Sequence, residues 1–188
     1  YDEVEAVPKI SSYGFEKGFV LLILVFEGNK EMSELEAGMT KEICLGNNGR
    51  YKGELAAREW LETRFSTKKM LDFDAIKGGT ADAIEVAAPW DCIENVWREM
   101  RKALEPMCTV VDCHFSHVYH NGASVYVIYH AKTDGDDKAG EERYLQCLDT
   151  AIQTSLKYGG NVSHHHGVGT AKAKYMEAEH GKAGVYVM

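Results

Sequence analysis

Hydrophobic and polar positions in the first third of the chain predict one strand followed by two helices. Residues 19–26 (FVLLILVF) form a short run of mainly branched apolar side chains, which is typical of a buried strand. Asn29 is a candidate N-cap for a helix that reaches about Leu45, and turn residues then fill positions 46–53. A second helical stretch follows, and we expect its buried side to consist of Leu55, Trp60 and Leu61.

The middle of the chain predicts a second strand and helix. Residues 83–88 (AIEVAA) alternate weakly between apolar and polar side chains, as a strand does. Pro89 is suited to the first turn of a helix that reaches Leu104 and carries apolar side chains at helical spacing. A further long helix is expected over about residues 138–158, and Gly159 ends it.

Between these two helices, alternating side chains predict a β-hairpin. Residues 109–119 and 123–131 alternate, and Asn121 and Gly122 lie between them as a two-residue turn. Strands, helices and a hairpin together indicate an α+β fold, in which helices pack on one face of an antiparallel sheet. Because no interdomain linker interrupts the pattern, we expect a single domain over residues 1–188.

The expected turn also predicts which hairpin side chains share a face. It places His117 opposite Tyr126 and directs His114 to the other face. Strand alternation then gathers a polar set on the face away from the helices: His117, Tyr119, Ser124, Tyr126 and His130. A tyrosine beside an imidazole can exchange a proton with it, and a nearby positive charge would lower the tyrosine pKa from about 10. The same residues are also ordinary cross-strand neighbours that need no chemical role.

Composition narrows the classes of function. The net charge is -8, from 21 Lys+Arg against 29 Asp+Glu, and no basic block is present, so we expect no nucleic-acid partner. The longest apolar run is far shorter than the roughly 18 residues of a membrane span, so we expect no membrane span and a cytoplasmic location. The five cysteines include no C-x-x-C pair, which predicts reduced thiols rather than a disulfide framework.

The most unusual segment is a run of three histidines followed by a glycine turn: His164, His165, His166, Gly167, Val168 and Gly169. Neighbouring residues of an extended segment point in different directions, so we expect no metal site among the histidines. The two glycines let the backbone turn and approach a ligand. This makes His165, Gly167 and Gly169 candidate contacts to a cofactor.

Four segments carry a resemblance to a known family. In chain order they are LVFEGNKE (24–31), AAPWDCIENV (87–96), SHVYHNGASVYVIYHA (116–131) and GGNVSHHHGVG (159–169). Their order and spacing resemble the C-terminal substrate, or cap, domain of FAD-linked oxidases in the vanillyl-alcohol-oxidase superfamily. Within that group the chain is most similar to alkyldihydroxyacetonephosphate synthase and its bacterial relatives.

The resemblance implies a ferredoxin-like cap domain that closes over FAD, while an N-terminal FAD-binding domain, absent from this chain, mainly holds the cofactor. Tyr126 is implied as the group that donates and accepts a proton. The histidines needed for activity fall on His164, His165 and His166, and His117 matches the histidine of an S-H-x-Y pattern. The implied partners are the FAD-binding domain and a small-molecule substrate, and a homodimer is compatible with them.

Two departures from the family pattern affect these expectations. Leu71 stands where the synthase has the arginine that binds the anionic group of its substrate, and the nearby candidates for that role are Arg64, Lys68 and Lys69, with Arg64 preferred. The chain also lacks the glycine-rich pyrophosphate loops and the family's C-terminal tail. We therefore expect a fragment that is inert by itself.

Three functions remain open at this point. The first is that of an FAD-dependent oxidoreductase acting on a small hydroxylated or carboxylated substrate at flavin N5. The second is a flavin-dependent transferase of ether-lipid synthesis, like the synthase. The third is a stand-alone α+β module that binds a ligand or a metal without a flavin.

Overall fold

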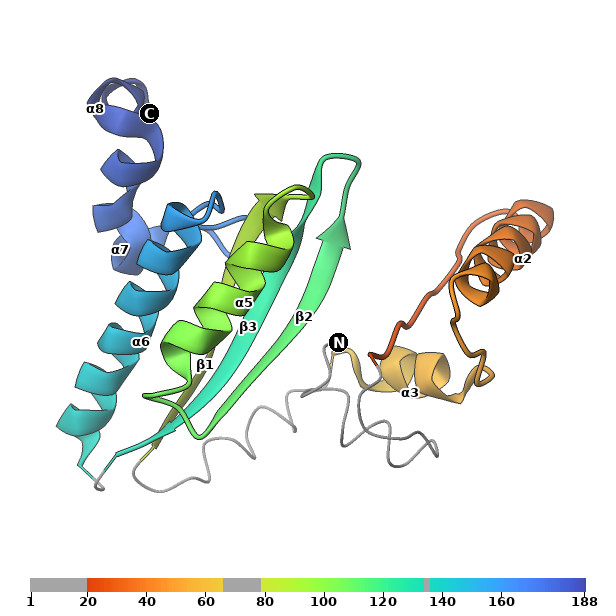
Figure 1. Ribbon diagram of the computed structural model, residues 1–188, viewed down its shortest axis with the longest axis horizontal. Helices are drawn as coiled ribbons and strands as arrows, with labels where there is room; N and C mark the ends of the chain where they lie inside the picture. Colours follow the sequence, from red (N-terminus) through yellow and green to blue (C-terminus); the bar gives the residue numbers. More distant parts are fainter. Residues whose placement is uncertain (1–19, 66–78, 134–135) are drawn as a thin grey trace.

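The fold is built on a three-stranded antiparallel sheet (Figure 1). A computed structural model describes residues 20–65, 79–133 and 136–188 of the chain. The strands are β1 (Gly79–Pro89), β2 (Val110–Val118) and β3 (Gly122–Lys132), in the spatial order β1-β3-β2. Helices α5 (Ile93–Leu104) and α6 (Asp137–Lys157) contact the sheet and each other. The α+β class predicted from the sequence is therefore confirmed.

The hydrophobic core lies between the sheet and these two helices. Val125, Val127 and Tyr129 of β3 are fully buried, as strand alternation predicts. They share the core with side chains from β1 and both helices: Ile84, Val86, Val96, Met100, Leu104, Leu148 and Ile152. The opposite face of the sheet, called the open face below, therefore carries the intervening residues of each strand.

The hairpin turn differs from the expected one. Tyr119 N donates to Gly122 O at 2.8 Å, so His120 and Asn121 form the turn. A side chain at Gly122 would place its Cβ 2.2 Å from Ala88 O, so this glycine is needed for close strand packing. It does not supply a left-handed turn, because its φ is not positive.

The pairing of residues across the hairpin also differs from the expected one. A register shift between Phe115 and Val118 puts His114, and not His117, opposite Tyr126. The prediction that His114 lies on the opposite face from Tyr126 is therefore wrong.

The start of α5 is also later than predicted. Pro89 is the last residue of β1, which is an edge strand and tolerates a residue without an N–H group. Trp90 N then donates to Asn121 O at 3.2 Å, and Trp90 Nε1 donates to Tyr119 O at 3.0 Å. These bonds keep residues 89–90 on the hairpin turn, and the helix begins at Ile93.

The N-terminal helices form where the sequence predicts them. They are α2 (Lys30–Gly46) and α3 (Leu55–Thr63), and Asn29 Oδ1 caps α2 by accepting from Glu31 N at 3.0 Å. Residues 20–27 have no regular secondary structure, so the predicted strand is wrong over this range, while Phe19 lies outside the described residues. A strand needs a neighbour, and the sheet that the structure describes does not include this segment.

The apolar side chains of these two helices are not buried as expected. The stripe on α2 is more than half exposed at each position: Met32, Leu35, Met39 and Ile43. Leu55 and Leu61 of α3 are also exposed. Among the residues described, no helix is both long enough and apolar enough to span a membrane.

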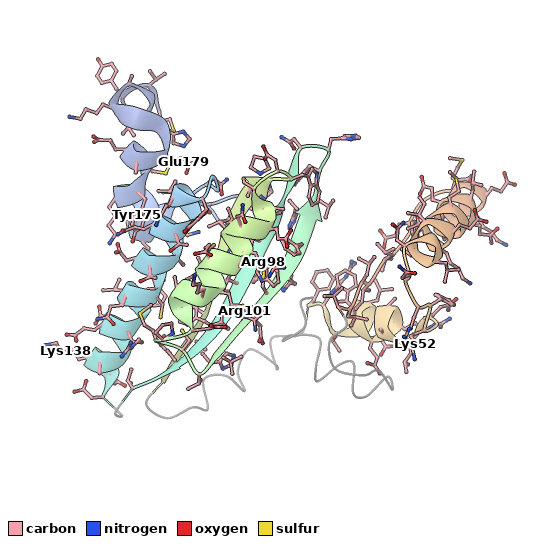
Figure 2. The ribbon with its side chains drawn as sticks, viewed as in Figure 1. Lys52, Arg98, Arg101, Lys138, Tyr175 and Glu179 are labelled. Carbon is pink, nitrogen blue, oxygen red and sulfur yellow. The ribbon has the colours of Figure 1, made fainter. Side chains whose placement is uncertain are left out.

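The C-terminal part of the chain packs on the end of α6. Gly159, with φ +93°, ends α6 as predicted, and the chain continues through α7 (Gly169–Lys172), a 3-10 turn (Ala173–Tyr175) and α8 (Met176–Val187). Tyr175 Oη donates to Asp149 Oδ1 at 2.8 Å, and Glu179 Oε2 accepts from Val162 N at 2.7 Å. Tyr175 and Glu179 lie in the C-terminal segment above α6 (Figure 2) and attach it to the rest of the fold.

Two leucines of α6 provide a test of where the core lies. Leu148 is 4% exposed and Leu145 is 49% exposed. We expect Leu148→Ala to lower the free energy of unfolding by about 2–5 kcal/mol because it leaves a cavity. The matched control Leu145→Ala should change it by less than about 0.5 kcal/mol. Urea denaturation followed by circular dichroism measures both, and equal losses would place the core elsewhere.

Candidate functional site

The candidate site lies on the open face, where a loop from α6 crosses the edge of β1. Residues 159–168, called the histidine loop below, connect α6 to α7. Asn161 N donates to Ala87 O at 2.9 Å, and Asn161 Oδ1 accepts from Ala87 N at 2.6 Å. Asn161 therefore occupies hydrogen-bonding groups on the free edge of β1, and the following residues reach the open face.

Glu85 of β1 is the centre of this loop's hydrogen bonding. Its side chain is fully buried, and the register places it opposite Tyr126 of β3. Glu85 Oε2 accepts from Ser163 Oγ at 3.1 Å, from His164 N at 3.0 Å and from His166 N at 3.3 Å. Glu85 Oε1 accepts from His165 N at 3.0 Å. Three successive backbone N–H groups thus surround one carboxylate, as in an anion-binding nest.

These hydrogen bonds favour the ionised form of the Glu85 carboxyl group. Burial by itself would raise the pKa of the carboxyl, but the three backbone N–H groups and the Ser163 hydroxyl outweigh it and lower the pKa below its ordinary value. Glu85 is therefore ionised at neutral pH, and the negative charge favours the wrapped conformation of the loop.

Lys172 provides a second buried charge beside Glu85. It is 8% exposed, and its Nζ donates to Glu85 O at 3.0 Å and to Ser163 Oγ at 3.2 Å. Burial lowers the pKa of Lys172, while the carboxylates of Glu85 and Asp82 act against that shift. The lysine thus links β1, the loop and α7, and it offsets part of the charge that the carboxylate buries.

Aromatic and imidazole rings gather above this buried pair. The ring of Tyr126 stacks on His114 with centroids 4.7 Å apart, and it lies 5.0 Å from the ring of His166 and 6.1 Å from that of His165. The His117 ring is 4.0 Å from His165.

Further ring contacts complete the cluster. His164 lies 5.8 Å from His117 and 5.4 Å from Tyr119. The structure therefore brings together all the predicted catalytic candidates: Tyr126, His117, His164, His165 and His166. His117 reaches the cluster although it does not pair with Tyr126, because the strand is irregular between Phe115 and Val118.

The pKa shifts in the cluster favour neutral groups. Burial, followed by the carboxylates of Asp82 and Glu85, raises the pKa of Tyr126, which is opposite to the shift that a nearby positive charge would cause. Burial also lowers the pKa of His165; Glu85 opposes this shift, while the nearby histidines reinforce it. At neutral pH a protonated phenol therefore lies close to a neutral imidazole, which is an arrangement of a proton donor and a proton acceptor.

Glu85, His164 and His165 also present three potential metal ligands. Their ligand atoms lie within 4.8 Å of one another. His165 Nδ1 is 3.2 Å from Glu85 Oε1 and 3.2 Å from His164 Nδ1, and His164 Nδ1 is 3.7 Å from the same oxygen. Ligand atoms around a tetrahedral zinc ion are about 3.3 Å apart. Neighbouring histidines can thus converge here, because the loop wraps around Glu85 and is not extended.

The remaining predicted residues lie at the margin of this cluster or away from it. Gly167 and Gly169 have φ of +80° and +52°, so they supply the turn that the sequence predicts after the histidines. Arg64 ends α3, and its guanidinium lies over the Phe65 ring at 4.7 Å rather than in the cluster. The described residues do not include Lys68, Lys69 and Leu71.

Sequence reasoning missed Glu85, Lys172 and His114. Glu85 is the one charged residue in an apolar strand segment, AIEVAA, and a charge in such a segment needs buried partners. That signal was available. Lys172 has no comparable signal in its local sequence, and His114 was assigned to the wrong face because the bulge in β2 was not predicted.

Comparisons with known proteins agree with this fold. Residues 3–188 match the family described as FAD linked oxidases, C-terminal domain. The chain is 25% identical over 173 residues to alkyldihydroxyacetonephosphate synthase of Dictyostelium discoideum, which covers 89% of this chain and 28% of that protein. It is 29% identical over 115 residues to an uncharacterized FAD-linked oxidoreductase, YgcU, of Escherichia coli K12, covering 56% of this chain and 24% of that protein.

A solved structure extends the likeness to three dimensions. One crystal form of alkyldihydroxyacetonephosphate synthase superimposes with a TM-score of 0.62 at 17% identity, covering 94% of this chain and 37% of that chain. This likeness establishes the fold alone. The chain thus spans little more than a quarter of the length of the Dictyostelium synthase that it matches. By the match over residues 3–188, the chain belongs to the family of FAD-linked oxidase C-terminal domains.

Proposed function

We propose that this domain forms the substrate side of an FAD-dependent oxidoreductase that acts on a small hydroxylated or carboxylated substrate. We further propose that a separate FAD-binding domain of the full protein mainly holds the cofactor. The observation that carries the proposal is the ring cluster: a protonated Tyr126 lies among the histidines on the open face, and the buried Glu85 fixes the loop that carries three of them.

The residues present on the open face fit a planar cofactor. The rings of Tyr126 and His165 lie nearly parallel, with 24° between their planes, and can face a third flat ring. A Cβ at Gly167 or Gly169 would meet no atom within 4 Å, so the backbone there is open to an approaching group. We assign the cofactor contacts to His165, Gly167 and Gly169. When bound, FAD accepts a hydride from a substrate carbon.

The chain's own residues handle the proton in this proposal. A hydroxyl substrate releases a proton as its carbon loses a hydride, and the neutral His165 is positioned to accept it. Tyr126 remains protonated and donates a hydrogen bond to the substrate oxygen. His117 contacts His165, and its Nδ1 lies 3.2 Å from Ser116 Oγ, which is 2.7 Å from the buried Ser124 Oγ. Because His117 is exposed and its ring lies 4.0 Å from that of His165, it provides the route by which the proton leaves for solvent, and the serine hydroxyls orient its ring.

A cavity meets the cluster at Tyr119 and His164, and we propose that it holds the part of the substrate that is remote from Tyr126 and His165, which do not line it. It has a volume of about 450 Å³ and lies between the hairpin turn, the end of β1 and the histidine loop. Its lining includes the small apolar residues Ala87 and Ala88 together with Tyr119 and His164. A site with mostly apolar walls and a few polar groups matches the usual character of small-molecule sites.

Tyr126→Phe in the full-length flavoprotein tests the proposal. We expect flavin to remain bound and the rate of flavin reduction by a 2-hydroxy acid or similar substrate to fall by about 10²–10³-fold, because one hydrogen-bond donor to the reacting oxygen is lost. Stopped-flow absorbance under anaerobic conditions measures this rate. Tyr186→Phe is the matched control, because Tyr186 is 92% exposed and should leave the rate unchanged.

The same preparation distinguishes a transferase from an oxidoreductase. The named relatives include alkyldihydroxyacetonephosphate synthases, which is why a transferase remains the alternative. If acyl-dihydroxyacetone phosphate and a fatty alcohol gave an ether product while no hydroxylated or carboxylated substrate bleached the flavin, the transferase would replace the proposed oxidoreductase. A Tyr126→Phe variant with normal rates in both assays would remove this tyrosine from the mechanism.

Glu85→Gln tests whether a buried charge holds the histidine loop. Glutamine keeps the size but loses the charge, so we expect the free energy of unfolding to fall by about 2–4 kcal/mol at pH 7. Because folding lowers the pKa of Glu85, its contribution is present above the unfolded value of about 4.3 and is lost as the pH falls through the folded value. The difference between wild type and variant should therefore shrink in acid.

Urea denaturation at several pH values measures this difference. Glu94→Gln is the control, because Glu94 forms an exposed ion pair with Arg98 at 2.8 Å and should cost less than about 1 kcal/mol. A difference that stays constant from pH 7 to pH 3 would contradict the ionised state of Glu85.

A second candidate function is the binding of a divalent metal ion, which the spacing of Glu85, His164 and His165 favours. Imidazole and carboxylate ligands suit zinc. We expect the tag-free chain to bind one equivalent of zinc in isothermal titration calorimetry, and His164→Ala to weaken binding by at least about tenfold. His180→Ala, on α8, is the control. No heat of binding for the wild type would exclude this candidate and leave the flavin proposal in place.

A further inference from the structure

Two cysteines lie in contact on the helix-covered side of the sheet, away from the candidate site. Cys108 precedes β2 and Cys147 belongs to α6, and their sulfur atoms are 3.7 Å apart although 39 residues separate them. Cys147 is fully buried and Cys108 is partly buried. Cysteine is often buried as a small apolar residue, so the contact by itself does not indicate a function.

The surroundings of the two sulfur atoms favour a thiolate. The hydrogen bond between the two sulfur atoms lowers the pKa of Cys147; burial opposes this shift and the positive charge of Arg143 supports it. The same hydrogen bond, followed by burial, raises the pKa of Cys108. The contact thus shifts the pKa values of the two thiols in opposite directions, which makes them unequal in acidity, as in a reactive dithiol.

Two buried polar groups lie near the pair. The Tyr129 hydroxyl and Arg143 Nε are buried and have no hydrogen-bond partner among the described residues. The pKa of Tyr129 is raised first by burial and then by the charge on Cys147, which places the phenol within electrostatic reach of that sulfur. The positive charge of Arg143 stabilises a thiolate on Cys147, whereas the Tyr129 hydroxyl donates to neither sulfur in the described structure.

We infer that Cys108 and Cys147 form a redox-active dithiol that a hydroperoxide oxidises to an intramolecular disulfide. This modification site is independent of the proposed function, because it uses none of the residues assigned to flavin or substrate. The remaining cysteines are Cys44, Cys92 and Cys113, and none of them forms a disulfide in the described part of the chain.

The reaction balances with one hydroperoxide for each disulfide. The thiolate of one cysteine attacks an oxygen of the peroxide, the O–O bond breaks, and hydroxide or alkoxide leaves and takes up a proton. The other cysteine then attacks the sulfur of the resulting sulfenic acid, the S–O bond breaks, and water leaves as the disulfide forms. Two thiols are oxidised by two electrons, and hydrogen peroxide is reduced to two molecules of water. The partly exposed Cys108 marks the side from which the oxidant approaches.

A bond between these sulfur atoms would connect the two elements that carry the ring cluster. β2 begins two residues after Cys108 and contributes His114 and His117. α6 contains Cys147 and leads directly into the histidine loop. The disulfide would therefore fix the start of β2 to α6 and restrict their relative movement.

Oxidation of the intact 188-residue chain tests the inference. We expect stoichiometric hydrogen peroxide to remove two of the five free thiols, with a Cys108–Cys147 cross-linked peptide in mass spectrometry after alkylation. Dithiothreitol should restore both thiols. Cys108→Ser should abolish the cross-link, whereas Cys92→Ser, at another partly buried cysteine, should retain it.

A second measurement separates a native disulfide from random oxidation. The native cross-link closes a long loop, so oxidation should raise the urea midpoint of the wild type and leave that of Cys108→Ser unchanged. A chain oxidised in guanidinium chloride should give mixed pairs instead. The inference fails if the folded chain yields other pairs, sulfinic or sulfonic acids only, or no loss of thiols, while circular dichroism confirms that it is folded.

Discussion

The charge of Glu85 is the constraint on which the candidate site depends. A carboxylate that is removed from water is costly unless hydrogen bonds replace its hydration. Here three consecutive backbone N–H groups and the Ser163 hydroxyl replace it, so the backbone of the histidine loop can adopt only conformations that point those groups at one side chain. The positions of the three imidazoles follow from this backbone conformation. The buried carboxylate therefore determines the arrangement of the site.

The edge of β1 connects this site to the core. A strand edge exposes unpaired backbone groups, and Asn161 and Lys172 satisfy those of Ala87 and Glu85. The loop thus covers the edge of the small sheet while carrying histidines to its open face. Residue alternation in β3 separates the two faces: Tyr126 contacts the histidines, and Tyr129, three positions later, is buried among the helices near the cysteine pair.

Sequence patterns predicted the structure correctly where it depends on residues that are close together in the chain. Asn29 as a cap, Gly159 as a helix end and the buried face of β3 are local properties, and all were predicted. The hairpin turn and the start of α5 were not, because both depend on the packing of residues 89–90 and Gly122 against each other. The strand predicted at 19–26 is wrong over its described part for a similar reason. An apolar run predicts a buried strand, but it does not identify the neighbouring strand with which it would pair. Tyr126 and the histidines were found through motifs, whereas the carboxylate that orders them lies nearly 80 residues earlier in the chain.

Burial has opposite effects on the pKa of Tyr126 and of His165, and this determines what the cluster can do at neutral pH. Removing water disfavours whichever form is charged, so the phenol keeps its proton and the imidazole remains without one. Glu85 favours protonation of both groups, yet the neighbouring histidines add to the effect of burial on His165 and keep its pKa lowered. A cluster of several imidazoles is therefore more than a set of alternative bases. The neighbouring rings help to keep the pKa of His165 lowered, which maintains a proton acceptor beside a proton donor above a carboxylate that is ionised at neutral pH.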